Sequence, residues 1–425
     1  MALRDRVAGI HRVPGDKSIT HRALMLAALA PGRSRIAGAL TSLDARSTAR
    51  VLRALGAEIS TLRASQDVTV RGKARFAPPH LRLHCGNSGT TARLMLGLLA
   101  GHRFSSILTG DGSLRRRPMR RVTDPLRVMG ASVEDRGNDG LPLEMQGGRL
   151  HPLDWRMEVP SAQVKSALLL AGMAGGVPVT LRGGSGTRDH TERMLGYFGF
   201  DVASRGDILR FTPTGKLAPF ALSVPGDPSS AIFLIASALL AGSGEIEVTG
   251  VGLNPTRTGY LAVLAQMGAL LAVETQDSSF GEPLGSIVAR ASTLKAVDVP
   301  AELIPGIIDE VPMLACLAAR AEGTSRFRSV QELRVKESDR LAMLVRNLRA
   351  VGVEATADGD DLIVQGTDAH LAGRVVTGGD HRIAMAFEVL GRLPGSAIRV
   401  DDPECAAVSF PGFASALRRL TGAGQ

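Results

Sequence analysis

The chain has 425 residues, of which 44% are hydrophobic and only 4% aromatic, and its formal net charge is +9. No apolar run reaches the roughly 18 residues that a membrane-spanning helix needs. Three widely spaced cysteines without a C-x-x-C pair argue against a disulfide framework or a zinc site. The start, M-A-L-R-D-R-V, lacks the apolar segment of a signal peptide, so we expect a cytoplasmic protein.

Six short turns, each expected to begin a helix, recur at spacings of 65 to 80 residues. In chain order they read V-P-G-D-K-S from Val13, C-G-N-S-G-T from Cys85, V-P-S-A-Q from Val159, V-P-G-D-P-S from Val224, I-P-G-I-I-D from Ile304 and T-G-G-D-H-R from Thr377. A recurrence of this length indicates a repeated α/β module. Because a helix N-terminus presents unpaired N–H groups and partial positive charge, anion binding is the first functional hypothesis.

Within each repeat we expect a buried helix, a strand, a surface helix and further strands. The run A-I-F-L-I-A-S-A-L-L-A from Ala231 is apolar on all sides, as an interior helix is. Short β-type runs such as 67–71 and 245–249 supply the strands. The second helix of each repeat is amphipathic and ends at a glycine. Those glycines are Gly56, Gly130, Gly199, Gly268, Gly352 and Gly422.

Six repeats divide into two domains of three, since one hydrophobic core rarely grows beyond about 250–300 residues. The last repeat is short and residues 1–12 belong to none, so we expect the N-terminal segment to complete the last repeat. The predicted domains are 14–223, and 1–13 plus 224–425. The chain would cross between them twice, near Val13 and Val224, forming a hinge beside an active-site cleft.

Five arginines crowd into residues 115–121, which raises nucleic-acid binding as an alternative. Against it, few aromatic side chains are available to stack on bases, and no recognised nucleic-acid motif is present. A small anionic substrate accounts for the positive charge equally well. We therefore expect neither nucleic acid nor a membrane as a partner, and a non-catalytic nucleic-acid-binding repeat protein stays the alternative from another class.

Cations lie at or near the openings, where they would add charge and bidentate hydrogen bonding to the helix starts. Any one of them alone is more often a solvated surface side chain, but their recurrence in one structural position favours an anion site. Lys336 and Arg340, four residues apart, would share one face of a helix. The others are Lys17, Arg22, Arg93, Lys165 and Arg382.

Two carboxylates are placed to transfer protons. Asp309 precedes an apolar helix and is either a proton acceptor or an ordinary N-cap, and Glu337 among cations is either an acid or a structural ion pair. His381 is equally explained as a buried hydrogen-bonding histidine. The same holds for three polar residues that suit helix caps: Asn87, Ser88 and Thr90. The residues predict a cleft of cations, helix starts and one or two carboxylates, for a substrate with several anionic groups.

Five motifs, in order from about Val13 to Phe413, resemble those of the 5-enolpyruvylshikimate-3-phosphate synthase family. They are P-G-D-K-S-I-T-H-R-A-L-M-L-A-A-L-A, G-N-S-G-T-T-A-R, S-A-Q-V-K-S-A-L-L-L-A, V-K-E-S-D-R-L and G-D-H-R-I-A-M-A. The resemblance implies an α+β fold of two domains, each of three βαβαββ-type repeats with buried parallel helices (an inside-out α/β barrel), joined by a two-strand hinge.

The resemblance also implies the reaction of a 3-phosphoshikimate 1-carboxyvinyltransferase, in the shikimate pathway of aromatic amino-acid biosynthesis. Such an enzyme transfers the enolpyruvyl group of phosphoenolpyruvate to the 5-hydroxyl of shikimate 3-phosphate and releases phosphate. The family is the target of the inhibitor glyphosate. No metal or organic cofactor is implied, and we expect a monomer.

By motif position, the resemblance assigns roles to individual residues. Catalytic roles fall to Asp309, Glu337, Lys17 and Lys336. Contacts to shikimate 3-phosphate fall to Lys17, Ser18, Arg22, Ser161, Ala162, Gln163, Arg188, Asp309 and Lys336. Contacts to phosphoenolpyruvate fall to Lys17, Gly89, Arg117, Gln163, Arg340 and Arg382. Asp309 would accept the 5-hydroxyl proton, while Glu337 with Lys17 or Lys336 would protonate the enolpyruvyl methylene.

The chain departs from the family pattern at three positions. Val408 stands where many members carry a lysine, Ala162 replaces a serine common in one branch, and Leu94 replaces a proline. These changes bear on phosphate coordination and inhibitor response. The nearest alternative is UDP-N-acetylglucosamine enolpyruvyl transferase, which shares fold and donor but typically carries a cysteine on a mobile loop. The corresponding stretch here, D-G-S-L-R-R-R-P-M, has none, and K-S-x-x-x-R with S-A-Q favours a phosphorylated acceptor.

Overall fold

The structure is a computed structural model that describes residues 6–135, 137 and 139–420. The chain forms two compact units, each with its own hydrophobic core. Unit I comprises Gly15–Val224 and Ser279–Glu282. Unit II comprises Met1–Pro14, Pro225–Ser278 and Pro283–Gln425.

The segment Ser279–Glu282 corrects the expectation that the chain crosses between domains only twice. The two main boundaries fall after Pro14 and Val224, one residue later than expected. The chain passes between the units two further times, on either side of Ser279–Glu282. The physical reason is a long β-hairpin whose strands pair in a sheet of unit II and whose tip packs into the core of unit I.

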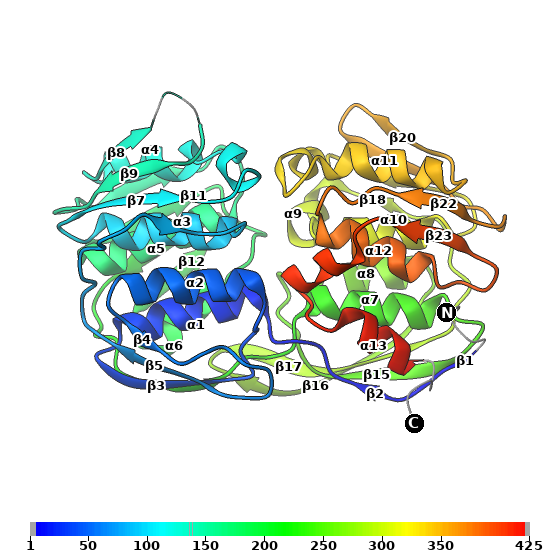
Figure 1. Cartoon of the computed structure of the whole chain (residues 1–425), viewed down its shortest axis with the longest axis horizontal. Helices are drawn as coiled ribbons and strands as arrows, with labels where there is room; N and C mark the ends of the chain where they lie inside the picture. The colour runs from blue at the N-terminus through cyan, green and yellow to red at the C-terminus, as the bar shows by residue number, and fades with distance from the viewer. Residues whose placement is uncertain (1–5, 136, 138, 421–425) are drawn as a thin grey trace. The chain divides into compact units, whose positions relative to one another are not determined.

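Unit I is built of three repeats in the expected order of buried helix, strand, surface helix and strands (Figure 1). Its helices are α1 (Lys17–Leu29), α2 (Leu43–Ala54), α3 (Gly89–Ala100), α4 (Arg120–Val128), α5 (Ala162–Gly175) and α6 (His190–Tyr197), with the 3₁₀ turn η1 (Leu114–Arg116). Its strands are β3 (Gly32–Ala37), β4 (Glu58–Ile59), β5 (Val68–Gly72), β6 (Leu83–His84), β7 (Ser105–Thr109), β8 (Ser132–Asp135), β9 (Leu143–Gln146), β10 (Leu153–Arg156), β11 (Val179–Arg182), β12 (Asp201–Arg205), β13 (Ile208–Thr212) and β14 (Ala221–Ser223).

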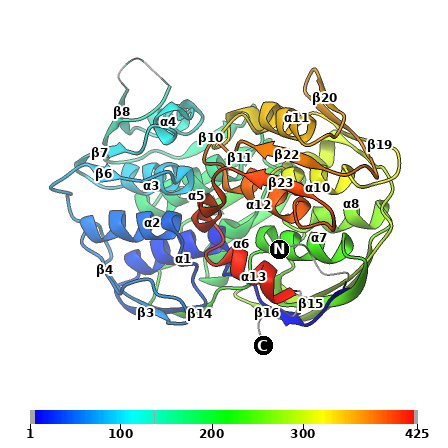
Figure 2. The ribbon, with the colours of Figure 1, turned by 45° about the vertical axis from the view of Figure 1, so that its right-hand side comes forward.

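The three sheets of unit I share one topology: β14-β3-β5-β4, β6-β7-β9-β8 and β10-β11-β13-β12. The last strand of each repeat leaves its own sheet and pairs in parallel with the first strand of the next one. The third repeat closes this arrangement, because β14 returns to pair in parallel with β3, as Figure 2 shows. The three repeats are therefore joined in a ring by their strands.

Close backbone packing holds the buried helices of unit I together. A Cβ atom added to Gly97 of α3 would lie 2.0 Å from the carbonyl oxygen of Ala167 in α5, and one added to Gly101 would lie 2.6 Å from the carbonyl carbon of Ala174. Glycine is required at these positions, since any larger side chain would push the two helices apart. The contact fixes the start of α3 relative to the start of α5.

Unit II repeats the same design with its own elements. Its helices are α7 (Pro228–Leu239), α8 (Gly259–Gln266), α9 (Ile304–Ile307), α10 (Val311–Ala318), α11 (Arg340–Ala350), α12 (His381–Leu390) and α13 (Phe413–Leu420), with the 3₁₀ turns η2 (Ala301–Leu303), η3 (Gln331–Val335) and η4 (Pro403–Val408). Its strands are β1 (Arg6–Val7), β2 (Ile10–His11), β15 (Ser243–Gly252), β16 (Leu270–Ser279), β17 (Glu282–Arg290), β18 (Asp298–Val299), β19 (Thr324–Phe327), β20 (Ala355–Asp358), β21 (Asp361–Gln365), β22 (Ala372–Val375) and β23 (Ala397–Val400). All twelve residues of α7 are buried, as its apolar sequence predicts.

The N-terminal segment supplies the strand that the sixth repeat lacks. β18 and β22 each join the next sheet in parallel, at β19 and β23. β1 and β2 pair in parallel with β15, in the position that β14 holds in unit I (Figure 1). The segment therefore completes the last repeat by joining the sheet of the fourth, and the mixed α/β architecture expected from the repeats is confirmed.

The surface helices end as the sequence indicates. Gly56, Gly130, Gly199, Gly268 and Gly352 follow α2, α4, α6, α8 and α11, with φ between +83° and +103°. Glycine adopts this left-handed region without the steric cost that a Cβ imposes, so it ends the helix. Gly422, the sixth predicted closing glycine, lies outside the described residues.

The fifth opening differs from the other five. The I-P-G-I-I-D stretch forms the short α9, then a turn over 308–310, before the buried α10 begins at Val311. Pro312 in the first turn of α10 restricts the residue before it and donates no hydrogen bond, which favours a fresh helix start over a continuous helix. Asp309 therefore lies in a turn between two helices.

Candidate active site

In unit I most of the predicted substrate residues lie at or near the starts of the three buried helices, while Arg117 follows η1 and Arg188 precedes α6. Asp16, Ser88 and Ser161 cap α1, α3 and α5, and each side-chain oxygen accepts a hydrogen bond from a backbone N–H of the first turn. The residues that open the helices directly after these caps are Lys17, Ser18, Gly89, Ala162 and Gln163.

Gln163 joins the starts of α5 and α3. Its Nε2 donates to Thr90 Oγ1 over 3.0 Å, and its Oε1 accepts from Arg93 Nη1 over 2.6 Å. Arg93 also donates from Nη2 to the carbonyl oxygen of Pro118, over 2.9 Å. The Gln163 amide is thereby held in one orientation by two neighbouring side chains.

Arg22, one turn into α1, is the most deeply buried cation of this group, with 3% of its surface exposed. Its Nε donates to Thr191 Oγ1 (2.7 Å), Nη1 to the Ser18 carbonyl (2.8 Å) and Nη2 to Ser166 Oγ (2.6 Å). All three acceptors are uncharged. Burial lowers the pKa of the Arg22 guanidinium to about 10, although the charges of Glu192, Asp16 and Glu282 act to raise it; the charge of Arg188 acts in the same direction as burial. A buried cation of this kind is poised to accept an anion.

The first turn of α6 surrounds Arg22 from a second side. Thr191, which accepts from Arg22, also donates to Ser166 Oγ over 2.8 Å. Glu192 lies 2.6 Å from the ammonium of Lys165, and both side chains are largely buried. Lys165, named from sequence as a cation near the third opening, is thus part of an internal ion pair.

A chain of hydroxyl groups connects α1, α2 and α3 beneath these helix starts. His21 Nδ1 shares a 2.6 Å hydrogen bond with Thr48 Oγ1, which contacts Thr91 Oγ1 at 2.6 Å. Thr91 Oγ1 donates to Ser88 Oγ over 2.8 Å. Burial, followed by the charges of Lys17 and Arg22, lowers the pKa of His21 well below its usual value, so this histidine is neutral.

Gly89 and Arg117 form the part of the unit I group assigned to phosphoenolpyruvate. A Cβ added to Gly89 would lie 3.1 Å from Arg93 Nη1 and 3.3 Å from Arg117 Nη1. Arg117 Nη2 donates to Asn87 Oδ1 over 2.5 Å, and Asn87 Nδ2 donates to Asp111 Oδ2 over 2.7 Å. The two guanidinium groups therefore flank Gly89, where the absence of a side chain leaves space for an anion.

Lys17 is paired within unit I. Its Nζ lies 3.3 Å from Asp44 Oδ2 of α2, and the Lys17 side chain is 17% exposed. Asp44 thus orients the ammonium while leaving part of it open. Asp44 was not found from sequence, because nothing in its surroundings marks it as the partner of a lysine 27 positions earlier.

In unit II, Arg340 gathers three carboxylates around one buried guanidinium. Its Nε donates to Asp380 Oδ2 (2.8 Å), Nη1 to Asp309 Oδ1 (3.2 Å) and Nη2 to Glu337 Oε2 (2.5 Å). Burial acts to lower the pKa of Arg340, but the three carboxylates outweigh it and raise the pKa above its ordinary value. Glu337 is thus in an ion pair, as one reading of the sequence held, and it stays 21% exposed and accessible.

Asp309 lies within 4 Å of three cations. Its carboxylate oxygens are 3.2 Å from Arg340 Nη1, 3.9 Å from Lys336 Nζ and 3.8 Å from Arg382 Nη2. The alternative that Asp309 is an ordinary N-cap is wrong, because the residue at the N-cap of α10 is Glu310. Three positive neighbours favour the ionised carboxylate, the form that a proton acceptor needs.

Arg382 connects the Asp309 group to a buried ionic network. Its Nη1 donates to the Asp309 carbonyl over 2.9 Å and lies 3.7 Å from Glu310 Oε1. Glu310 is fully buried and accepts a short hydrogen bond from Ser229 Oγ. Ser229 Oγ in turn accepts a hydrogen bond from Arg257 Nη2 over 2.7 Å. Glu310 is therefore placed to fix the direction of the Arg382 guanidinium.

The structure brings the predicted residues together in two groups. The unit I group contains Lys17, Ser18, Arg22, Gly89, Arg117, Ser161, Ala162, Gln163 and Arg188. The unit II group contains Asp309, Lys336, Glu337, Arg340 and Arg382. The partners that sequence reasoning missed are Asp44, Thr48, Asp111, Ser166, Thr191, Glu310 and Asp380. Asp380 stands inside the G-D-H-R motif, so its position beside Arg382 was the available signal.

Several remaining positions have structural roles. Ser88 is a cap, as one reading held, and His381 is 1% exposed at the start of α12. Leu94 is fully buried in α3. Val408 is half-buried at the end of η4, close in sequence to Phe410, whose ring lies 5.3 Å from that of Phe413.

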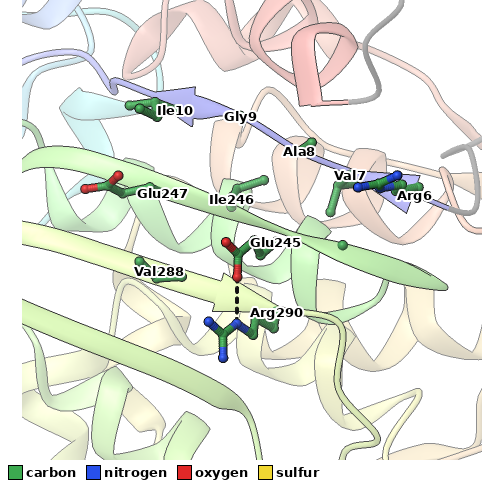
Figure 3. A pocket seen from close by; sticks show the side chains of 11 residues that line it. Arg6, Val7, Ala8, Gly9, Ile10, Glu245, Ile246, Glu247, Val288 and Arg290 are labelled. Carbon is green, nitrogen blue, oxygen red and sulfur yellow. Dashed lines mark hydrogen bonds and ion pairs between the residues drawn. The ribbon is translucent and has the colours of Figure 1, made fainter.

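One cavity of unit II lies away from these charged residues. It measures about 620 Å³ and is bounded by β1, β15 and β17 (Figure 3). Its charged side chains include Glu245 and Arg290, which pair with each other over 2.7 Å. None of the predicted substrate residues lines it.

The described residues form neither a metal-binding cluster nor a membrane-spanning helix. Within residues 6–135, 137 and 139–420, no group of three or more His, Cys, Asp or Glu side chains is arranged to hold a metal ion. Over the same part of the chain, no helix has the length and hydrophobicity to cross a membrane.

A repeated α/β fold that presents cations and carboxylates at helix starts is typical of an enzyme acting on small anionic molecules. The family model described as EPSP synthase (3-phosphoshikimate 1-carboxyvinyltransferase) matches residues 2–417. The chain belongs to this family.

Named relatives agree over almost the whole length. The 3-phosphoshikimate 1-carboxyvinyltransferases of Gluconobacter oxydans and Thermus thermophilus are 48% and 49% identical, over 98% and 97% of this chain and 96% of each relative. The solved EPSP synthase of Acinetobacter baumannii matches with a TM-score of 0.84 and 37% identity, over 97% of this chain and 96% of that one. The enolpyruvyl transferase NikO of Streptomyces tendae, 18% identical with a TM-score of 0.79, covers 99% of this chain and 96% of its own, and shares the fold.

Proposed function

We propose that this chain binds phosphoenolpyruvate and shikimate 3-phosphate and transfers the enolpyruvyl group to the 5-hydroxyl of the latter, releasing phosphate. The observation that carries the proposal is Arg22. It is buried beside the starts of α1 and α5, and its three hydrogen bonds go to the uncharged oxygens of Thr191, Ser18 and Ser166. The phosphate of the acceptor would give the guanidinium a negatively charged partner in direct, charge-assisted hydrogen bonds.

The acceptor would bind at the helix starts of unit I. Ser18 and Ser161 offer hydroxyl groups, Gln163 offers an amide that Thr90 and Arg93 already orient, and Arg188 adds a second positive charge near Arg22. Ala162 contributes its backbone N–H at the first position of α5, which needs no particular side chain. Lys336 of unit II would complete the set.

The donor would bind to Lys17, Arg117, Arg340 and Arg382, with Gly89 leaving room for it. Two of these cations already contact carboxylates in unit II. The carboxylate and phosphate of phosphoenolpyruvate must therefore compete with, or displace, some of these contacts. We propose that the existing contacts with carboxylates keep Arg340 and Arg382 in fixed directions before the donor arrives.

The reaction requires two proton transfers. Phosphoenolpyruvate becomes electrophilic at C2 only as C3 gains a proton, so an acid must act while the 5-hydroxyl attacks. We assign acceptance of the hydroxyl proton to Asp309, and protonation of C3 to Glu337 with Lys17 or Lys336. The tetrahedral phospho-ketal then loses phosphate and a proton from C3, and the cations stabilise the leaving group. We propose that no metal or organic cofactor takes part.

We further propose the finer family architecture for this chain: two inside-out α/β barrels with parallel buried helices, and a hinge at the connections after Pro14 and Val224. Each substrate has assigned contacts in both units, so both groups of residues must act on the same bound molecules. A smaller radius of gyration with shikimate 3-phosphate in small-angle scattering is the expected result. We also propose a cytoplasmic monomer, with a sedimentation coefficient that does not change with concentration.

The direct test is phosphate release. The purified protein is incubated with phosphoenolpyruvate and either shikimate 3-phosphate or UDP-N-acetylglucosamine. Release that depends on shikimate 3-phosphate is the expected outcome. Release only with UDP-N-acetylglucosamine, or with neither acceptor, would overturn the proposed function.

A further inference from the structure

The tip of the β16–β17 hairpin is anchored in unit I, beside the group assigned to shikimate 3-phosphate. The strands β16 and β17 pair with each other, and β17 pairs with β15, in a sheet of unit II. The tip, Ser279–Glu282, belongs to unit I. Phe280 is 5% exposed and packs in the hydrophobic core of that unit.

Glu282 makes the central contact of this anchor. Its Oε1 lies 2.7 Å from His190 Nδ1, and each side chain is 1% exposed. The neighbouring Gly281 accepts a hydrogen bond at its carbonyl from Arg193 Nη1, over 2.7 Å. A buried carboxylate is expensive to desolvate, and the close contact with His190 offsets part of that cost.

His190 begins α6, whose first turn carries the contacts that hold Arg22. Thr191, the next residue, accepts from Arg22 Nε and donates to Ser166. Arg188 stands two residues before His190, and its charge lowers the pKa of Arg22, while the charges of Glu192, Asp16 and Glu282 act to raise it. This turn therefore supplies one of the three contacts that orient the Arg22 guanidinium, and it braces a second one through Ser166.

The start of α6 has no side-chain capping hydrogen bond from its N-cap residue. The side chain of Asp189, its N-cap residue, makes no capping hydrogen bond and instead accepts from Arg193 Nε over 2.9 Å. A side-chain cap normally fixes the chain direction at this point. The contact between His190 and Glu282 provides the fixed point instead.

We infer that Glu282 is a positioning residue for the acceptor site: by holding His190 it fixes the first turn of α6, and through Thr191 it fixes Arg22 toward the acceptor phosphate. The inference rests on the proposed function, because the phosphate of shikimate 3-phosphate is the ligand that Arg22 would bind. Glu282 itself does not touch substrate. Its effect is therefore on acceptor affinity and not on the chemical step.

The test compares Glu282→Ala and Glu282→Gln with wild type. In Glu282→Ala we expect the dissociation constant for shikimate 3-phosphate, measured by calorimetry, and its KM to rise about tenfold or more, the scale of a lost buried hydrogen bond to a charged group. The KM for phosphoenolpyruvate and kcat at saturating acceptor should change less than about twofold. Glu282→Gln keeps a hydrogen-bonding oxygen and should recover part of the affinity.

Two controls separate positioning from general structural damage. Glu274→Ala changes an exposed carboxylate on the same hairpin and should leave both KM values unchanged. Thr191→Val removes the next link, so the double variant with Glu282→Gln should weaken acceptor binding by less than the product of the two single effects. Should Glu282→Ala fail to fold, the Glu282→Gln and Thr191→Val pair carries the same test.

The inference is overturned if the Glu282 variants bind shikimate 3-phosphate like wild type, or if both KM values rise together with a lower melting temperature. These outcomes differ from failure of the proposed function, which appears as absence of acceptor-dependent phosphate release in the wild-type protein itself.

Discussion

Arg22 donates a 2.7 Å hydrogen bond from Nε to the hydroxyl of Thr191, and its other two contacts are also with uncharged oxygens. Arg257 is buried to a similar degree, yet its Nη2 lies 3.0 Å from the carboxylate of Asp227. The three hydrogen bonds of Arg22 thus go to uncharged groups, whereas Arg257 is paired directly with a carboxylate. Replacing each arginine by an uncharged side chain of similar length should therefore change the stability of the protein differently: replacement of Arg257 should lower it, and replacement of Arg22 should not.

We predict that Arg22→Met leaves the melting temperature of the free protein equal to or above that of wild type, because the variant no longer bears the cost of burying a cation whose pKa burial lowers in spite of the nearby charges of Glu192, Asp16 and Glu282. Shikimate 3-phosphate at a hundred times its dissociation constant should stabilise the wild type by about 2.7 kcal/mol and the variant hardly at all. Thermal unfolding with and without ligand measures both effects. Arg257→Met is the matched comparison and should lose about 3–5 kcal/mol, since it leaves Asp227 buried without its partner. A similar loss in both variants would contradict the distinction.

Gly89→Ala is predicted to weaken inhibition by glyphosate by about tenfold or more. The added methyl would lie 3.1 Å from Arg93 Nη1 and 3.3 Å from Arg117 Nη1, so the guanidinium groups must shift or the pocket must shrink. Glyphosate is slightly longer than phosphoenolpyruvate, so it should compete with the donor and be affected more strongly. Inhibition constants and the donor KM are measured together. Gly112→Ala, whose Cβ would meet only Arg116 Nη1 at 3.8 Å, should behave like wild type. Equal inhibition of the Gly89 variant and wild type would show that Gly89 does not bound the pocket.

The sequence indicated much of the fold because its signals are local. The helix starts at Lys17, Gly89 and Ala162 follow their caps directly, and the closing glycines mark helix ends through backbone geometry alone. The partners of these residues are not local. Asp44 is 27 positions from Lys17, and Thr191 is 169 positions from Arg22, so only the folded chain reveals the pairs. For the same reason, the sequence could not predict that Ser279–Glu282 belongs to unit I.

Asp309→Asn should lower kcat by roughly 10²-fold or more while leaving shikimate 3-phosphate binding nearly intact. The amide keeps the size of the side chain but no longer accepts the hydroxyl proton, and it removes the negative charge shared by Lys336, Arg340 and Arg382. Calorimetry of acceptor binding and steady-state turnover separate the two effects. Asp368→Asn, an exposed carboxylate near Arg320, is the control. Wild-type turnover in Asp309→Asn would place the proton acceptor elsewhere.

Asp380→Asn should reduce the free energy of unfolding at neutral pH by about 3 kcal/mol, because Asp380 is fully buried against Arg340. Burial acts to raise the pKa of Asp380, but the charge of Arg340 and its hydrogen bond outweigh burial, so the pKa lies below its ordinary value. A carboxyl group with a lowered pKa contributes stability above its unfolded-state pKa, about 4, and that contribution is lost as the pH falls through the folded-state value.

The wild type should therefore lose the advantage over the variant as the pH drops below about 4, and the two curves of unfolding free energy should converge. Urea unfolding between about pH 3 and pH 7 gives both curves, and the exposed Asp368→Asn serves again as the control. Curves that stay parallel over this range would mean that the charge of Asp380 does not stabilise the fold and that its role is to cap α12, which asparagine performs equally well.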